Sequence, residues 1–477
     1  MIKFHSYGSK IPGPPSHPIF GNAKFFSGKS GAEVIDFFKE NARKVRESGQ
    51  SVMRFQMPGK LIIWPLTGQT VAKIIESSTE IHKGDDYSFF DPWIGQGLLV
   101  AVGDRWKTHR KMITPTFHFA KLEGYLDVFN SESKILVYII GDYADNGNTI
   151  DMMPFIKRCT LDIICGTAMG TKVDAQYNHN HKYVEATEGY TRMMLKYSFN
   201  PLLWNKFVFW ALGYRKQCDE YLYHLKKFTS DVIKERRNGI ESGEVEKESS
   251  KRKMNFLDSL LNMKESNVFS EEEIREEVDT FMFGGHDTTT TSASWTCWNL
   301  AHNPDIQQKV FEELIEVVGD NISDDITYEQ INQLSYLDKV LKESKRIIAP
   351  VPAFQRKLQK ELIIDGYTIP SEANVAIAPV ALHDNHLVWT NPDVFDPERF
   401  SPEEISKRHP YDYLPFSAGV KNCIGQKFSM LNEKVMISHI IRNFKLVPKL
   451  GYHETKPSFE IVAKPSKGIP IQLIRRV

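Results

Sequence analysis

The spacing of apolar and polar positions predicts a chain that is mainly α with a minor β part. Most of the 477 residues place apolar side chains at helical intervals. Four shorter stretches, bounded by turn residues, are typical of strands instead. These stretches are SVMRFQM at 51–57, KLIIWPL at 60–66, ELIIDGYTI at 361–369 and NVAIAPVAL at 374–382. No internal repeat is visible, so the pattern predicts one large, mostly helical domain.

One long predicted helix has a weak centre. Ser270 and Glu273 form a capping box at its start, and Asn303 before a proline ends it, which gives a length of roughly 50 Å. Its middle reads GGHDTTTT from Gly284 onward, and glycine and threonine are poor helix formers. Glycine lets a flat ligand approach the backbone, while aspartate and threonine can disturb helical hydrogen bonds and hold water. Packing of a second helix against these small residues is the alternative.

A cysteine near the end of the chain lies in the stretch PFSAGVKNCIG at 415–425. Apolar positions after Cys423 follow helical spacing, so Cys423 is predicted at a helix N-terminus, which favours its thiolate. Gly419 and Gly425 leave room beside the sulfur for a planar ligand. A lone thiolate cannot close a structural zinc site, but it can be an axial ligand to a haem iron or a nucleophile. Taken alone, it can also be a small buried hydrophobe.

The amino-acid composition argues against several classes of protein. Lys+Arg and Asp+Glu are 60 each, so the net charge is zero and gives no support to a nucleic-acid binder. The 5 cysteines are odd in number and include no CxxC pair, so neither a disulfide framework nor a zinc site is indicated. This usage is typical of a reducing compartment. The cysteines are Cys159, Cys165, Cys218, Cys297 and Cys423.

Two stretches punctuate the chain. Residues 11–21, IPGPPSHPIFG, carry four prolines and are typical of a stiff extended hinge. We therefore expect an N-terminal segment and hinge at 1–21, with a membrane anchor missing before it, and the main domain at 22–477; an ordinary irregular N-terminus is the alternative. No stretch of about 18 apolar residues exists to span a bilayer. The charged stretch 236–253 is predicted to be a solvated loop between two helices.

The cysteine loop resembles the haem-binding loop of the cytochrome P450 superfamily. Phe416, Gly419, Cys423 and Gly425 match that motif, and Lys421 stands where arginine is usual.

Other motifs of that family occur in the family's order between 106 and 425. GGHDTT at 284–289 resembles the oxygen-binding motif, and FDPERF supplies Arg399. KESKR supplies the Glu343 and Arg346 pair, and WKTHR supplies Trp106 and Arg110. The stretches at 91–99, 110–119, 200–213 and 276–289 are similar to the family-4 clan, whose best-known members oxidise fatty acids and related lipids.

The resemblance implies a cytochrome P450 fold with a single large haem-thiolate domain that binds haem b. It implies that Cys423 is the axial thiolate and that Asp287 and Thr288 relay protons during oxygen activation. Gly284 and Gly285 would lie beside the haem. Many clan members carry a glutamate at the position of Gly284 that forms an ester with the haem, so we expect a non-covalent haem here.

The resemblance also assigns supporting roles around the haem. Trp106, Arg110, Arg356 and Lys421 would hold the propionates, with Lys421 offering only a point charge. A buried network would fix the loop before the cysteine without taking part in catalysis. Its members would be Glu343, Arg346 and Arg399.

The implied function is a monooxygenase that uses O2 and electrons from NADPH. A flavin protein, NADPH-cytochrome P450 reductase, would deliver them, with cytochrome b5 as a further donor. The enzyme would hydroxylate or epoxidise a lipophilic substrate that is fatty acid-like, a terpenoid or a xenobiotic, contacted by residues 88–97 and 190–213. A family member that rearranges hydroperoxides without O2 is a second possibility, against which Asp287 and Thr288 argue. A non-enzymatic haem or lipid binder is a third.

Two surfaces are expected to serve partners. A basic patch near the haem would dock the electron donor, unless it is an ordinary solvated face. Its expected members are Arg105, Lys107, Arg110, Lys111, Lys421 and Lys427. The apolar segment 201–212 would touch a membrane surface, or else pack on the core. Together with the expected anchor, this places the working protein on the cytosolic face of the endoplasmic reticulum membrane.

Overall fold

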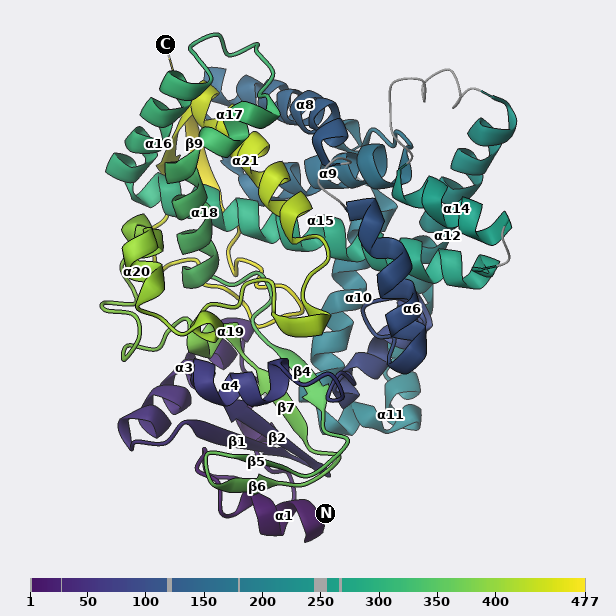
Figure 1. The fold of residues 1–477 in the computed structure, drawn as a ribbon, viewed down its shortest axis with the longest axis vertical. Helices are drawn as coiled ribbons and strands as arrows, with labels where there is room; N and C mark the ends of the chain where they lie inside the picture. The colour runs from purple at the N-terminus through teal and green to yellow at the C-terminus, as the bar shows by residue number, and fades with distance from the viewer. Residues whose placement is uncertain are drawn as a thin grey trace.

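The computed structural model describes residues 2–26, 28–117, 122–178, 181–243, 255–265 and 268–476. Helices fill most of the molecule, and the long helix α15 (Glu271–His302) crosses its centre (Figure 1). A small sheet lies beside the N-terminus, at the opposite end from the C-terminus. This arrangement is the mainly α fold with a minor β part that the sequence predicts.

Helices and short 3₁₀ turns alternate with brief strands along the chain. The first half contains α1 (Ile2–Gly8), α2 (Ala23–Phe26), α3 (Gly31–Glu47), β1 (Val52–Met57), β2 (Lys60–Pro65), α4 (Gly68–Ile75), η1 (Asp85–Phe90), α5 (Asp91–Ile94), α6 (Gly103–Ile113), η2 (Thr114–Phe117), η3 (Glu123–Tyr125), α8 (Leu126–Asp145), β3 (Thr149–Asp151), α9 (Met152–Ile164), the π-helical turn η4 (Cys165–Met169), η5 (Ala175–Tyr177), α10 (Lys182–Phe199), η6 (Pro201–Trp204), α11 (Lys206–Ala211) and α12 (Tyr214–Glu241). The second half contains α14 (Phe256–Glu265), α15, α16 (Pro304–Val317), α17 (Tyr328–Gln333), α18 (Ser335–Ile347), β4 (Phe354–Lys357), β5 (Leu362–Ile364), β6 (Tyr367–Ile369), β7 (Asn374–Ile377), α19 (Pro379–Leu382), η7 (Pro397–Phe400), α20 (Pro402–Ser406), η8 (Pro410–Asp412), η9 (Gly419–Lys421), α21 (Gln426–Asn443), β8 (Phe444–Pro448) and β9 (Pro470–Arg475).

The largest sheet has the strand order β1-β2-β7-β4. Strands β2 and β7 pair in parallel, and the other two pairs are antiparallel. Strands β1 and β2 confirm two of the predicted stretches. The third stretch, 361–369, is two short strands joined by a turn in which Asp365 and Gly366 have φ of 49° and 77°. The fourth, 374–382, was only half right, because Pro379 begins helix α19 and ends the sheet pairing.

The proline-rich segment is packed against the sheet instead of standing free as a hinge. Pro12 O accepts a hydrogen bond from Arg54 N at 2.8 Å, and Asn22 N donates to Gln56 O at 2.6 Å. A Cβ at Gly13 would lie 2.3 Å from Arg54 O, so only glycine fits there. Residues 12–22 therefore run along strand β1. Within the described ranges, no helix combines the length and apolar character needed to cross a membrane.

The charged stretch at 236–253 is not a loop from its first residue. Helix α12 continues through Glu241, because Arg236 is tied to Asp258 of α14 by two hydrogen bonds of 2.7 and 2.8 Å. Arg236 Nη1 also donates to Gly170 O at 2.9 Å. The guanidinium of Arg236 therefore bonds to protein groups, although the sequence pattern predicts that it is solvated. Residues 244–253 lie outside the described residues.

Helix α15 keeps its predicted bounds and remains helical throughout. Ser270 and Glu273 form the capping box, and the helix ends at His302. Thr288 Oγ1 donates to Gly284 O at 2.8 Å, and other threonines of the run bond the carbonyl four residues earlier in the same way. The threonine hydroxyls therefore bond back to carbonyls of their own helix, which stays continuous through this segment.

Candidate active site

A cavity of about 430 Å³ lies between α15 and the loop that leads into α21. Its walls are mainly apolar, and it contains Cys423 on one side and Gly284, Gly285 and Thr288 of α15 among its lining residues. Cys423 has an exposed side chain although it lies deep inside the molecule, because it faces this cavity. A nucleophilic or metal-binding sulfur is thus presented to an internal space large enough for a sizeable apolar ligand.

The loop before α21 is folded tightly around the cysteine. Cys423 N donates to Phe416 O at 2.9 Å, which closes the loop on itself. Gly419 has φ of 66°, and a Cβ there would lie 2.2 Å from Ile75 O. Only glycine can occupy that position, as the motif requires. A Cβ at Gly425 would meet Cys423 Sγ at an ordinary 3.9 Å, so Gly425 keeps space beside the sulfur without being needed for the backbone.

The protonation of Cys423 differs from the sequence expectation. Helix α21 begins at Gln426, so the cysteine precedes its first turn as predicted. Burial raises the pKa of the Cys423 thiol, and the Gly425 N–H and Arg110 lower it only in part. The helix start alone therefore does not hold a thiolate here. A metal ion bound at the sulfur would supply the missing positive charge.

The adjacent glycines Gly284 and Gly285 of α15 have different structural roles. A Cβ at Gly284 would meet nothing within 4 Å, so this residue opens the cavity against the helix backbone. A Cβ at Gly285 would lie 2.7 Å from Ile164 Cδ1, so this residue permits close packing against α9. Beside them, Thr288 lines the cavity. A flat ligand can therefore approach α15 at Gly284 while Thr288 offers it a hydroxyl.

Asp287 is buried and faces α9, away from the cavity. Its Oδ1 lies 3.2 Å from Lys157 Nζ, and Lys157 also donates to Glu188 of α10 at 2.7 Å. Burial would raise the pKa of Asp287, but Lys157, Lys464 and His286 outweigh burial and hold it below its usual range. The structure therefore places Asp287 and Thr288 on different sides of the same helix turn.

Sequence reasoning missed Lys157 and Glu188. One sequence signal was available, because Lys157 interrupts the apolar face of MMPFIKRCTLDII. In the structure this lysine is only 1% exposed. A cation at a core position of a helix requires an acidic partner, but nothing in the sequence says which one.

A cluster of cations, one of them buried and three partly exposed, lines the cavity. Arg110, Arg356 and Lys421 all face it, and Lys83 joins them although sequence reasoning missed it. Burial, Arg356 and Arg110 lower the pKa of Lys421 to about 7, and burial with the neighbouring cations lowers that of Lys83 well below its usual value. Within the described residues, none of the four forms an ion pair with a carboxylate. Such a set of like charges calls for an anionic ligand.

Individual contacts hold parts of this cluster in place. Lys421 Nζ lies 4.6 Å from the ring centre of Trp106 and donates to Ala101 O at 2.6 Å. Arg110 donates twice to Asn422, to its O at 2.9 Å and its Oδ1 at 2.7 Å. Trp106 and Arg110 of α6 are thereby joined to the cysteine loop, although they are more than 300 positions away from it in the chain.

Glu343 and Arg346 of α18 form a buried bidentate pair with hydrogen bonds of 2.7 and 2.8 Å. Arg399 Nε lies 3.4 Å from Glu343 Oε1, and Asp396 N donates to the same carboxylate at 3.0 Å. Arg346 also donates to the carbonyl of His383 at 3.0 Å. The three predicted network residues thus lie together and anchor the segment that precedes the cysteine loop.

The predicted basic patch is smaller than expected. Arg105 is paired with a glutamate of α15 at 2.6 Å, and Arg110 is turned into the cysteine loop. Arg110 and Lys421, which both line the cavity, are therefore corrections to the expected docking surface, whereas Arg105 is paired but keeps a side chain that is 37% exposed. Lys107, Lys111 and Lys427 are exposed.

Comparison with known proteins agrees with this geometry. The family model Cytochrome P450 matches residues 11–473. Cytochrome P450 4V2 of Pongo abelii is 39% identical over 97% of this chain and 89% of its own length. Cytochrome P450 4d2 of Drosophila melanogaster is 35% identical over 97% of this chain and 93% of its own. The solved structure titled "Crystal structure of cytochrome P450DA heme domain" has a TM-score of 0.82 at 22% identity and covers 98% of both chains, which shows a shared fold.

The cavity fits the haem b that this family carries. Its walls are mainly apolar, a glycine opens space on α15, a cysteine sulfur faces it, and its cations lack an anion among the described residues. The chain belongs to the cytochrome P450 family, resembles its family-4 members, and is a haem-thiolate monooxygenase.

Proposed function

We propose that this enzyme uses O2 and electrons from NADPH, delivered by NADPH-cytochrome P450 reductase, to hydroxylate or epoxidise a lipophilic substrate. The observation that carries the proposal is the sulfur of Cys423 facing an apolar cavity, with Gly284 and Thr288 among the same lining residues. When bound, the haem supplies the iron at which oxygen is activated. The apolar walls exclude water and select a fatty acid-like, terpenoid or xenobiotic substrate.

Residues in and around the cavity have separate roles in holding the haem and supplying protons. Cys423 is the axial thiolate, and Phe416 and Gly419 shape the loop that presents it. Thr288 holds a proton donor at the cavity surface, and Asp287 maintains negative charge directly behind it. An acid and an alcohol suit proton relay, and because these two side chains lie on different sides of the helix turn, the relay would pass through water. The role of Asp287 is supported by its charge, since its neighbours keep it ionised.

The haem is retained by non-covalent contacts in this proposal. Arg110, Arg356 and Lys421, together with Lys83, neutralise the propionates, and Trp106 orients Lys421. Gly284 has no carboxylate with which to form an ester. The Glu343 network supports the cysteine loop from behind and takes no part in catalysis.

We also propose that the enzyme works on the cytosolic face of the endoplasmic reticulum membrane. Within 201–212, Leu202, Phe207 and Trp210 are 67%, 70% and 64% exposed. Leu203 is buried and Phe209 packs on the core, so the segment is anchored while its other face stays apolar and open. Such a face is typical of contact with a membrane interface. Lys107, Lys111 and Lys427 are exposed and would dock the reductase or cytochrome b5.

Reconstitution with purified reductase tests the function. The haem-loaded chain, NADPH and a panel of fatty acids, terpenoids and xenobiotics should give oxygenated product only when the reductase is present. Consumption of a hydroperoxide without NADPH, and no NADPH-dependent product from any member of the panel, would instead support a hydroperoxide-rearranging enzyme.

A further inference from the structure

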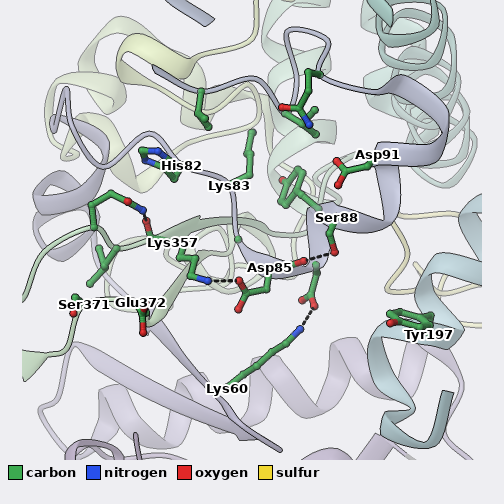
Figure 2. Close-up of a pocket in the computed structure, with 18 of the residues that line it drawn as sticks. Lys60, His82, Lys83, Asp85, Ser88, Asp91, Tyr197, Lys357, Ser371 and Glu372 are labelled. Carbon is green, nitrogen blue, oxygen red and sulfur yellow. Dashed lines mark hydrogen bonds and ion pairs between the residues drawn. The ribbon is translucent and has the colours of Figure 1, made fainter. Parts of the chain in front are cut away.

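A second, outer pocket of about 890 Å³ lies next to the active-site cavity. It is more polar than the inner cavity, and its walls come from the start of β2, the segment around η1, the end of β4 and the region of η6. Figure 2 shows Lys60 and Lys357 within it, each reaching toward an acidic side chain. The outer pocket shares Lys83 with the cation cluster, but most of its lining residues do not touch the inner cavity.

Five residues line both spaces and therefore form the wall between them. They are Lys60, Lys83, Asp86, Tyr87 and Trp204. Within this wall, Lys60 Nζ lies 2.8 Å from Asp86 Oδ1 and 4.8 Å from the ring centre of Trp204. The three side chains come from β2, η1 and η6, so their contacts join three separate elements within this wall.

The partners of Lys60 are each held from behind. Gln355 Nε2 donates to Asp86 Oδ2 at 3.2 Å, and Trp204 Nε1 donates to Tyr197 O at 2.9 Å. The ammonium group of Lys60 is held by these two partners' side chains, at the end of a long flexible stem. The Lys60 side chain is thus the flexible member of the contact, whereas Asp86 and Trp204 are each held in place by a further hydrogen bond.

The contact with Asp86 is weak enough to exchange. The side chains of Lys60 and Asp86 are 23% and 31% exposed, and ion pairs that reach solvent contribute little to stability. A carboxylate arriving from the outer pocket can take the place of Asp86 on the lysine at little net cost. The nearby Lys357 is paired with Asp85 at 2.7 Å. Because Lys357 lines the outer pocket but not the inner cavity, it is not part of the wall between them.

We propose that Lys60, Asp86 and Trp204 form a gate between the outer pocket and the haem cavity, opened by an amphipathic substrate whose anionic end replaces Asp86 on Lys60. This inference rests on the proposed function and adds to it the residues that select a fatty acid-like substrate by its anionic end. The apolar chain of the substrate extends past Trp204 into the inner cavity, while its carboxylate stays at the wall.

Binding of dodecanoate and methyl dodecanoate to the haem-loaded chain, measured by calorimetry, tests the gate. Lys60→Gln should raise the dissociation constant of dodecanoate about tenfold and leave that of the ester unchanged. Asp86→Asn should lower the dissociation constant of dodecanoate, because the internal competitor is gone. Lys357→Gln removes the same charge from the same outer pocket and should change neither value.

Some results would overturn the gate. These are equal weakening of acid and ester in Lys60→Gln, no change in that variant, or no gain for dodecanoate in Asp86→Asn. Lys60→Arg keeps the charge and should bind dodecanoate like the parent, which separates a lost charge from a misfolded chain. The absorbance of the reduced, CO-bound haem reports the proposed function independently. A normal band with unchanged selectivity rejects only the gate, whereas a missing band in the parent chain rejects the function itself.

Discussion

Replacing Lys157 by methionine removes the central cation of the buried network behind Asp287. Lys157 Nζ lies 3.2 Å from Asp287 and 2.7 Å from Glu188. The side chains of Lys157 and Asp287 are 1% and 0% exposed, so water cannot replace the lost partner. The side chain of Glu188 is 40% exposed and can be solvated instead. The penalty therefore falls almost entirely on Asp287.

Removing one partner of a buried ion pair costs about 3–5 kcal/mol, because an uncompensated charge remains. Lys464 still attracts Asp287 in this variant, so we expect the lower end, about 3 kcal/mol, in the free energy of unfolding. In the parent, the pKa of Asp287 is held below its usual range, so its stabilising contribution is present above the ordinary aspartate pKa and is lost only as pH falls through the folded pKa. In Lys157→Met, burial outweighs the remaining attraction and raises that pKa. Protonation then removes the isolated charge, and the loss of stability shrinks as pH falls.

Urea unfolding of the haem-loaded chain, followed by circular dichroism at about pH 8 and about pH 5.5, measures both effects. Lys227→Met is the matched control, because Lys227 and Asp231 form an exposed pair at 54% and 60% exposure and should contribute less than about 1 kcal/mol. The double variant Lys157→Met with Asp287→Asn should recover much of the loss. The reasoning is refuted if Lys157→Met unfolds within about 1 kcal/mol of the parent, or loses the same stability at both pH values.

Three further variants test the cavity and the membrane face. Thr288→Ala should keep substrate affinity but divert reducing equivalents to peroxide; unchanged product per NADPH would contradict its role in proton relay. Gly284→Glu places a carboxylate where a Cβ meets nothing within 4 Å, so acidified solvent should leave part of the haem attached to that variant and release all of it from the parent. Haem attached to the parent chain would show that a different residue forms the bond. Phe207→Asp combined with Trp210→Asp should reduce flotation of this chain with liposomes, and equal flotation would place the membrane contact elsewhere.

The sequence predicted local features more accurately than contacts between distant segments. The capping box at Ser270 depends on neighbouring residues, so pattern alone located the start of α15. The end of the sheet pairing before Pro379 was missed because apolar side chains continue past it. The extension of α12 past Arg236 was missed for a different reason. That arginine is paired with an aspartate on another helix, which a charged sequence cannot reveal.

The site shows the same division. The cysteine loop and the Glu343–Arg346 pair are short local motifs, so the sequence alone identified the residues that form them. Lys83 was missed because it joins the cation cluster only when the segment before η1 pairs with β4 at Arg356. The ion pair of Arg105 was missed for the same reason, since its glutamate partner lies on α15.

The most direct test of the account is the absorbance of the reduced, CO-bound protein with Cys423 replaced by histidine. Thiolate-ligated haem gives a band near ~450 nm, and Cys423→His should abolish it while the protein still binds haem. Single replacements of Cys159, Cys165, Cys218 and Cys297 should each leave the band in place. A Cys423→His variant that keeps the band near ~450 nm would show that another residue is the axial ligand and would contradict the central claim.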